Sequence, residues 1–218
     1  MDYLHELPVT LISVDNIEAD DTIAYMCRSI FNDTNRYNVT VMSSDRDFLQ
    51  LVNDGCNVWS PTKKILYDTD KVFTEYELSP ENYLTYRALT GDKSDNIPGI
   101  KGIGLKTLQK RFPVLFEQDK RVTVEDIINI SSEKESTSNT YNSINANREQ
   151  LRLNEQLMQL HNVDISEFTK NKISVQMNNE RNHLSKSNFI RMLAEDRMTL
   201  VKDIIGWLNN FNYLESHN

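Results

Sequence analysis

Carboxylate side chains gather in three short segments of the sequence, and oxygen-rich clusters of this kind suit divalent cations. The segments are Glu18-Ala19-Asp20-Asp21, Asp45-Arg46-Asp47 and Asp92-Lys93-Ser94-Asp95. Seven carboxylates brought together would repel one another unless cations neutralise them. Carboxylate oxygens without a neighbouring histidine or cysteine favour Mg²⁺ or Mn²⁺ over zinc. Two such ions about 4 Å apart form the clamp that hydrolyses phosphodiester bonds, and this is the chemistry that we expect.

Each acidic segment also has a plainer interpretation. Acidic residues at the start of a helix are ordinary caps and favourable partners of the helix dipole, and one segment alone would favour that role. All three segments, however, lie where a strand ends or a helix begins or ends. Groups beyond the carboxyl ends of parallel strands meet in one crevice. We therefore prefer a shared metal site.

Four of the six glycines lie between Gly91 and Gly104, in a stretch too compact for a helix. Gly99, Gly102 and Gly104 allow positive φ and let the backbone approach another molecule closely. Four cations follow with no acidic residue between Asn96 and Phe116, and they are Lys101, Lys106, Lys110 and Arg111. Backbone amides at the start of the next helix bind anions. The stretch predicts a helix-hairpin-helix that grips a nucleic-acid backbone without reading bases; a plain tight turn is the alternative.

The elements that would position these residues begin with a small α/β layer. Short apolar runs predict strands, and a 3.6-residue apolar spacing predicts helices between them. The expected strands are 9–14, 38–43 and 57–60, the expected helices are 17–30 and 47–52, and 63–72 is a hairpin or an extended excursion. This alternation is typical of a parallel sheet.

The remainder of the chain reads as helical. Expected helices cover 81–89, 105–112, 124–130, 148–161 and 188–213, the last in one or two pieces. Residues 131–147 are nearly all polar, so we expect a flexible loop there. The expected division is an α/β domain half (1–75), a helix-hairpin-helix region (76–130), the loop (131–147) and a C-terminal helical region (148–218).

The overall composition narrows the class of protein. The formal net charge of −8 argues against unspecific binding of polyanions, although local patches decide binding. Cys27 and Cys56 are too few for a disulfide framework and fit a reducing cytosol. No apolar run reaches the roughly 18 residues of a membrane-spanning helix. Asp2 and Glu6 stand where a signal peptide carries cations, so we expect a soluble, cytoplasmic protein.

Three stretches of the sequence resemble the 5′ nucleases in order and spacing. They are "IEADDTIA", "VMSSDRDFLQLV" and "TGDKSDNIPGIKGIGLKT". The family includes the 5′-nuclease domain of bacterial DNA polymerase I, phage flap endonucleases and the ribonuclease H of T-even phages. The resemblance covers Ile17 to Phe112 and extends loosely to the end. It implies a partial PIN-like, Rossmann-like parallel sheet, then a helix-3-turn-helix and C-terminal helices.

The resemblance also implies roles for single residues. Glu18, Asp20 and Asp21 fall on the acidic motif of the first metal site. Asp45 and Asp47 fall on the aspartates that serve the second site and bridge toward the first, and Asp92 and Asp95 complete the second site. Among them, Asp20, Asp45 and Asp47 are the expected catalytic residues. Lys101 and Lys106 would contact phosphates of duplex DNA, and the carbonyls of Ile100 and Ile103 would hold K⁺. The products would carry a 5′-phosphate and a 3′-hydroxyl.

The sequence departs from the family pattern before the first acidic segment. Family members carry a further strand, two more aspartates and a cationic helical arch ahead of it, and we find no matching motif before Ile17. We expect the C-terminal part of a nuclease whose N-terminal part either is a separate chain or has been lost. The alternatives are a non-catalytic, structure-selective DNA-binding accessory protein, or a chain that nicks slowly unaided. Flap or nicked DNA and RNA-DNA hybrid are the expected substrates, during replication and primer removal in a bacterium or in the host of a phage.

Overall fold

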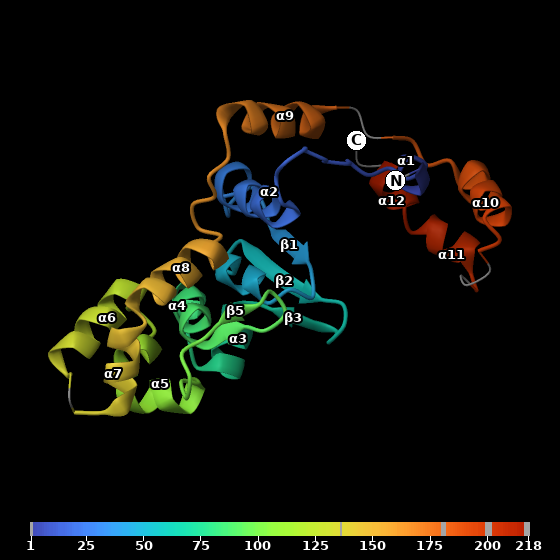
Figure 1. Ribbon diagram of the computed structural model, residues 1–218. Coiled ribbons are helices and arrows are strands. Elements are labelled where there is room, and N and C mark those ends of the chain that lie inside the picture. Colours follow the sequence, from blue (N-terminus) through green and yellow to red (C-terminus); the bar gives the residue numbers. More distant parts are fainter. Residues whose placement is uncertain (1, 136, 180–181, 199–201, 216–218) are drawn as a thin grey trace. The chain divides into compact units, whose positions relative to one another are not determined.

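The computed structural model describes residues 2–135, 137–179, 182–198 and 202–215. It divides the chain into two compact units (Figure 1). One unit comprises Glu18–Asp164, and the other comprises Met1–Ile17 together with Ile165–Asn218. All seven predicted metal ligands and the glycine-rich turn belong to the first unit, which therefore contains the candidate site.

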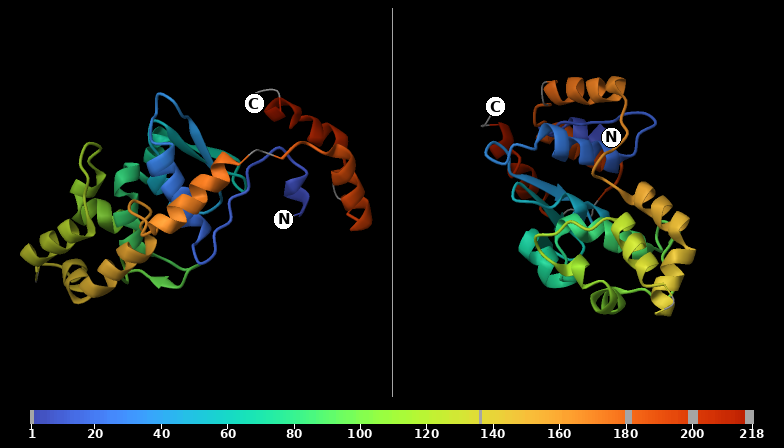
Figure 2. Two further views of the ribbon diagram at one scale, coloured as in Figure 1. Left: turned by 90° about the horizontal axis from the view of Figure 1, so that it is seen from above. Right: turned by 90° about the vertical axis from the view of Figure 1, so that its left-hand side faces the viewer.

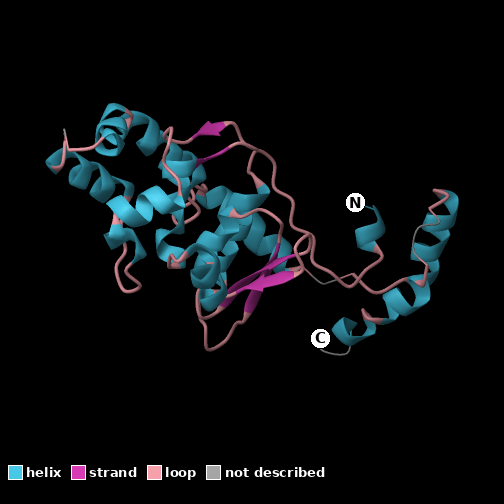
Figure 3. Ribbon diagram, turned by 90° about the horizontal axis from the view of Figure 1, so that it is seen from below, coloured by secondary structure: helices cyan, strands magenta, loops and turns pink. Residues whose placement is uncertain are grey.

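The first unit begins with a small mixed sheet and the helical segments around it. Helix α2 (Ala19–Tyr25) continues as a π-helical turn, η1 (Met26–Ile30). Strand β1 (Val39–Met42) is followed by the 3₁₀ helix η2 (Asp47–Leu51), then by β2 (Cys56–Ser60) and β3 (Ile65–Tyr67). β1 and β2 are parallel, with Val41 opposite Val58, whereas β2 and β3 are antiparallel (Figure 3). The mixed α/β fold class is confirmed. Within 63–72, β3 supplies the second strand of a hairpin, whereas residues from Thr69 onward begin a helix.

The second half of this unit is helical. Its helices are α3 (Thr69–Tyr76), α4 (Pro80–Thr90), α5 (Leu105–Arg111), η3 (Pro113–Phe116), α6 (Val124–Glu133), α7 (Asn139–Ala146) and α8 (Arg148–Met158). The short strands β4 (Gly91–Asp92) and β5 (Ile97–Pro98) pair between α4 and α5. α4 packs against both α8 and η2. Figure 2 shows α4 to α8 (green to orange) gathered beside the sheet (blue to cyan).

One apolar core runs through both halves of the unit. Leu49, Val58, Leu89 and Ile127 belong to the same buried cluster, although they come from the sheet layer and from the helices. Burial of a large aliphatic side chain contributes about 1.5–3 kcal/mol. Because α4 ends inside this core, the turn that follows it is anchored to the sheet.

The expectation of a flexible loop over 131–147 is wrong. α6 extends to Glu133, and residues 139–146 form helix α7. Ser138 caps α7 by accepting a hydrogen bond from the Thr140 amide, and Tyr141 and Ile144 are buried. The Tyr141 ring packs edge-on against Phe112, with the ring centroids 5.4 Å apart. Two apolar residues three positions apart were enough to anchor a short helix, and the average polarity of the segment concealed them. The four-part division of the chain stays a prediction.

The second unit contains α1 (Asp2–His5), α9 (Glu167–Asn178), α10 (Lys186–Glu195), α11 (Ile204–Asn209) and α12 (Asn212–Glu215). Leu7, Phe189 and Leu208 form its small core. The expected helical content of 188–213 is confirmed in separate pieces. No helix that the structure describes is long and apolar enough to cross a membrane.

The strand expected at 9–14 is wrong. The structure describes these residues as an irregular segment of the second unit. The Ser13 amide donates to the Gln176 side-chain carbonyl over 2.8 Å, and the Gln176 side-chain amide donates to the Ser13 carbonyl over 2.9 Å. A side-chain amide thus satisfies backbone groups that a neighbouring strand would otherwise pair. An apolar run predicts a strand only where such a neighbour exists.

Candidate metal centre and nucleic-acid interface

The three acidic segments meet around one cavity of about 390 Å³. Six of the seven predicted ligands line it, and they are Glu18, Asp20, Asp21, Asp45, Asp47 and Asp95. The seventh, Asp92, lines an adjoining cavity of about 360 Å³ that shares Asp45 with the first. The carboxyl end of β1 and the start of α2 therefore converge with the turn after α4, as the sequence predicted.

The local backbone explains how each segment presents its carboxylates. Glu18 occupies the N-cap position of α2, and Asp20 and Asp21 lie in its first turn. Asp45 and Asp47 lie between β1 and η2, where the Asp47 amide donates to Asp45 Oδ1 over 2.8 Å. In this described part of the chain, the Glu18 side chain makes no capping hydrogen bond. Simple helix capping therefore does not account for the first segment.

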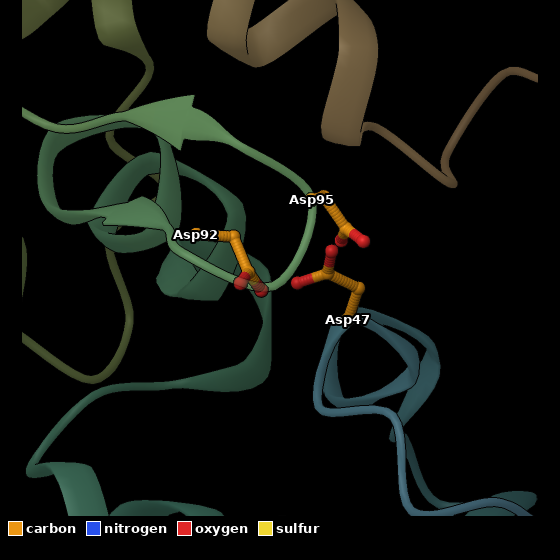
Figure 4. Close-up of side chains that lie close together, drawn as sticks. All are labelled: Asp47, Asp92 and Asp95. Atoms are coloured by element: carbon orange, nitrogen blue, oxygen red, sulfur yellow. The ribbon is translucent and has the colours of Figure 1, made fainter.

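Asp47, Asp92 and Asp95 form the tightest group in the site. One carboxylate oxygen from each lies within 4.8 Å of the other two, and the side chains point toward a common centre (Figure 4). The amide of Ser94 donates to Asp92 Oδ1 over 2.7 Å, and the Ser94 hydroxyl also contacts this oxygen. Burial raises the pKa of Asp92, but hydrogen bonds from Ser94 and Arg87 outweigh it and lower the pKa to about 2. Asp92 is therefore held as a carboxylate.

Electrostatic repulsion is concentrated on Asp20. Burial raises the pKa of Asp20, and the charges of Asp45, Glu18, Asp21 and Asp95 raise it further. Burial also raises the pKa of Asp47, while the neighbouring Arg87 opposes that change. Carboxylates that are partly buried beside like charges, and whose pKa values rise for that reason, are short of positive charge. A divalent cation in the cavity would supply it.

Arg87 is a site residue that sequence reasoning missed. It lies in the last turn of α4, five residues before Asp92. Its Nε donates to Asp47 Oδ1 over 2.8 Å, and its Nη2 contacts Asp92 Oδ2. The available signal was an arginine one helical turn before a glycine and an aspartate. At that spacing the arginine lies on the same face of the helix as the start of the following turn.

The glycines of the turn have two different functions. At Gly99 a Cβ atom would lie 2.0 Å from the Thr90 carbonyl oxygen, and at Gly91, with φ +73°, it would lie 2.2 Å from the Gly99 nitrogen. These two glycines are therefore needed where the chain crosses itself. At Gly102, with φ +81°, and at Gly104 no described atom lies within 4 Å of the Cβ position. Only Gly102 and Gly104 leave room for another molecule. The assignment of Gly99, Gly102 and Gly104 to nucleic-acid binding stays a prediction.

The cations after the turn lie on or near α5. Lys101, Lys106 and Lys110 are exposed, whereas Arg111 is half-buried with its guanidinium 5.9 Å from the centre of the Tyr141 ring. Ile100 is buried, and its amide donates to the Leu89 carbonyl over 2.9 Å. The Ile103 amide donates to the Ile100 carbonyl over 3.1 Å. The expected K⁺ ligand Ile100 thus already has one hydrogen-bond partner.

The sequence of this chain matches two family models and several known proteins. The family model described as the 5′-3′ exonuclease N-terminal resolvase-like domain matches residues 1–77, and the one described as the 5′-3′ exonuclease C-terminal SAM fold matches residues 78–181. DNA polymerase I of Mycobacterium tuberculosis is 40% identical over 111 residues, which is 49% of this chain and 12% of the polymerase. Thermostable DNA polymerase I of Thermus aquaticus is 38% identical over 104 residues (48% and 12%). A 5′-3′ exonuclease of Buchnera aphidicola is 35% identical over 112 residues (50% and 38%).

Solved structures share the fold. A mutant of the T5 5′-exonuclease matches with a TM-score of 0.62 at 23% identity, over 76% of this chain and 67% of that protein. The flap endonuclease of bacteriophage T5, in a complex with DNA and metal ions, matches with a TM-score of 0.59 at 22% identity, over 84% and 61%. The chain spans only about an eighth of the polymerases that it matches in sequence. Because the two family models together match residues 1–181, the chain belongs to the 5′-3′ exonuclease family.

Proposed function

We propose that this chain supplies the acidic site and the nucleic-acid-binding turn of a divalent-metal-dependent 5′-3′ exonuclease or flap endonuclease. The reaction is hydrolysis of phosphodiester bonds in branched or nicked DNA, or in RNA-DNA hybrid, during replication and primer removal. The observation that carries the proposal is the convergence of carboxylates from three separate segments on one cavity. The family to which the chain belongs supports the same reaction.

The donor set fits Mg²⁺ or Mn²⁺. Every predicted ligand is a carboxylate, and the oxygens of Asp47, Asp92 and Asp95 are close enough to share one ion. Glu18, Asp20 and Asp21 would hold a second ion, with Asp45 between the two groups. Ions bound there would polarise a phosphate oxygen and lower the pKa of a water molecule. Solved structures of the T5 protein with metal ions, zinc among them, support an ion-binding role.

The side chains themselves have separate tasks in this proposal. Asp20, Asp45 and Asp47, the proposed catalytic group, line the cavity together and orient what binds in it. Asp92, kept charged by Ser94 and Arg87, is a fixed anionic ligand in the adjoining cavity. Such preorganised charge lowers the cost of reorganisation during reaction.

The turn and α5 would seat the phosphate backbone. Lys101, Lys106, Lys110 and Arg111 supply the positive charge, and Gly99, Gly102 and Gly104 supply a compact backbone. The T5 flap endonuclease structure that contains DNA supports a DNA substrate. Carbonyls of Ile100 and Ile103 are the proposed ligands of a K⁺ ion. The proposal places the protein in the cytoplasm, which is that of the host if a phage encodes it.

An N-terminal nuclease fragment is the proposed protein partner. β1 is an edge of the three-stranded sheet, and among the described residues no strand pairs with its outer side. Unpaired amides and carbonyls on an edge strand can accept another strand. The partner would thereby extend the sheet next to the acidic cavity.

A cleavage assay tests the proposal. A labelled 5′-flap DNA and an RNA-DNA hybrid are incubated with Mg²⁺ or Mn²⁺ and the chain, alone and mixed with an N-terminal nuclease fragment. We expect cleavage that Asp45→Asn abolishes and that Glu135→Gln, an exposed carboxylate outside the cavity, leaves unchanged. DNA binding without cleavage under every condition would contradict the enzyme and would indicate the accessory protein instead.

Salt dependence tests the binding surface separately. Lys101→Ala with Lys106→Ala should flatten the slope of log binding constant against log salt by about 2, since each phosphate contact contributes about 0.9. Lys120→Ala, an exposed lysine away from the turn, is the matched control. An unchanged slope in the double variant would remove these lysines from the interface.

A further inference from the structure

Arg87 joins two of the three acidic segments through one side chain. Its side chain is 11% exposed, and the Asp47 and Asp92 side chains that it contacts are each 14% exposed. Nε bonds to Asp47, Nη2 to Asp92, and Nη1 lies 3.4 Å from the Gly91 carbonyl oxygen. The planar fork therefore fixes the positions of two carboxylates and of the turn between α4 and β5.

The charges explain why such a contact matters. Two partly buried carboxylates side by side are costly unless a cation pairs with them. Arg87 supplies one positive charge against the three negative charges of Asp47, Asp92 and Asp95. Each contacted carboxylate gives Arg87 one oxygen, Oδ1 of Asp47 and Oδ2 of Asp92, and keeps its second oxygen. The second oxygen of Asp47 is thereby left for another ligand.

We propose that Arg87 is a positioning residue whose guanidinium acts as a permanently bound cation beside Asp47 and Asp92. It holds Asp47 and Asp92 in place before a divalent ion binds, and its charge weakens the binding of that ion. The inference rests on the proposed metal site, and it concerns this site's occupancy rather than cleavage. The chain can then fold with its acidic group already assembled, and it takes up the ion reversibly.

The two effects of Arg87 lead to opposite changes in a neutral variant. Without the guanidinium, the metal-free chain must hold Asp47 and Asp92 together with no counter-charge, so its unfolding midpoint falls. A divalent ion then meets a net charge of −3 in place of −2 and binds more tightly. Mn²⁺ should consequently stabilise the variant more than it stabilises the wild type.

The experiment uses the whole chain and MnCl₂ as the only probe. Mn²⁺ binding is measured by titration calorimetry, and thermal unfolding is measured with and without Mn²⁺, for wild type, Arg87→Met and Arg87→Lys. In Arg87→Met we expect Mn²⁺ to bind at least tenfold more tightly at the site of Asp47, Asp92 and Asp95, equivalent to about 1.4 kcal/mol of extra stabilisation at saturation. Arg87→Lys keeps the charge, so its Mn²⁺ affinity should stay within threefold of the wild type. Arg191→Met, which removes an exposed arginine from the other unit, should change neither quantity.

The outcomes separate this inference from the proposed function. Wild-type chain that binds no Mn²⁺ would refute the metal site itself, whereas binding that Arg87→Met leaves equal or weaker would overturn only the role of Arg87. Arg87→Lys that behaves like Arg87→Met would also overturn it, because charge would not be the cause. If Arg87→Met does not fold, Arg87→Gln replaces it as the neutral variant. Folding of either only when Mn²⁺ is present supports the inference, and failure of both even with Mn²⁺ contradicts it.

Discussion

Asn154 is expected to hold the turn that carries Asp92 and Asp95 in place from the opposite helix. It is fully buried in α8. Its side-chain amide donates to the Ala88 carbonyl over 2.9 Å and to the Pro98 carbonyl over 2.8 Å. Those two carbonyls lie on either side of the segment that carries Asp92 and Asp95. One side chain therefore closes the base of the turn.

The size of the effect follows from the two carbonyls that Asn154→Ala would leave without a donor. An unsatisfied buried polar group costs about 1–3 kcal/mol. The bond to Ala88 is buried and the bond to Pro98 is only partly buried, so the variant should lose about 1–4 kcal/mol of the free energy of unfolding. Small domains are stable by only about 5–15 kcal/mol, so a loss of this size is readily measured. Leu153→Ala, on the same helix but 47% exposed, is the matched control and should cost less than about 1 kcal/mol.

Urea unfolding measures this loss in the unit that contains the site. Trp59 lies in β2, so its fluorescence reports on that unit once Trp207, in the other unit, is replaced by phenylalanine. Hydrogen exchange of the Ile100 amide, which is bonded to the Leu89 carbonyl, gives a local reading of the same turn. A loss below about 0.5 kcal/mol together with unchanged exchange at Ile100 would refute this explanation of how the turn is held.

Two further predictions concern pH and the glycines. Burial, aided by Arg28 and Arg121, lowers the pKa of His161 to about 4, so the unfolded chain binds more protons between pH 6.5 and 4. Stability should fall as the pH drops through this window, by at most about 3 kcal/mol, and His161→Asn should flatten that part of the urea-measured profile. Gly99→Ala should lower the free energy of unfolding by at least about 3 kcal/mol, because the new methyl group would overlap the Thr90 carbonyl oxygen. Gly102→Ala should cost only about 1–2 kcal/mol through its positive φ, and equal losses in the two thermal melts would show that the turn is not packed as described.

The parts of the site that the sequence predicted are those governed by local rules. Val39–Met42 alternates as a strand, and the carboxyl end of such a strand in a parallel pair faces the ligand crevice. Asp45 and Asp47 could therefore be placed beside Asp20 without a structure. The glycine-rich turn was equally visible, because positive φ and close backbone approach select glycine.

The parts that were missed depend on tertiary partners. Residues 9–14 have the composition of a strand, but the Gln176 side chain takes the place of a neighbouring strand. Residues 139–146 have the composition of a loop, but Phe112 gives Tyr141 a surface to pack on. In both segments the outcome was decided by a contact with a residue distant in the sequence. No window of sequence contains that information.

The same dependence explains why Arg87 and Asn154 escaped notice although they organise the site. Arginine near a helix end is ordinary as a partner of the helix dipole, and an asparagine within a helix is ordinary on its surface. Their significance arises only where α4 ends in the core and α8 packs across it. There, Arg87 binds Asp92 of the turn and Asp47 of η2. Asn154 binds the carbonyls at the base of the turn. The turn that carries Asp92 and Asp95 is thus held from both sides, and the Ile100 amide, bonded to Leu89, continues the same anchored segment to Lys101. A shift of the glycine-rich turn would therefore strain the positions of Asp92 and Asp95, which share one short stretch of chain with it.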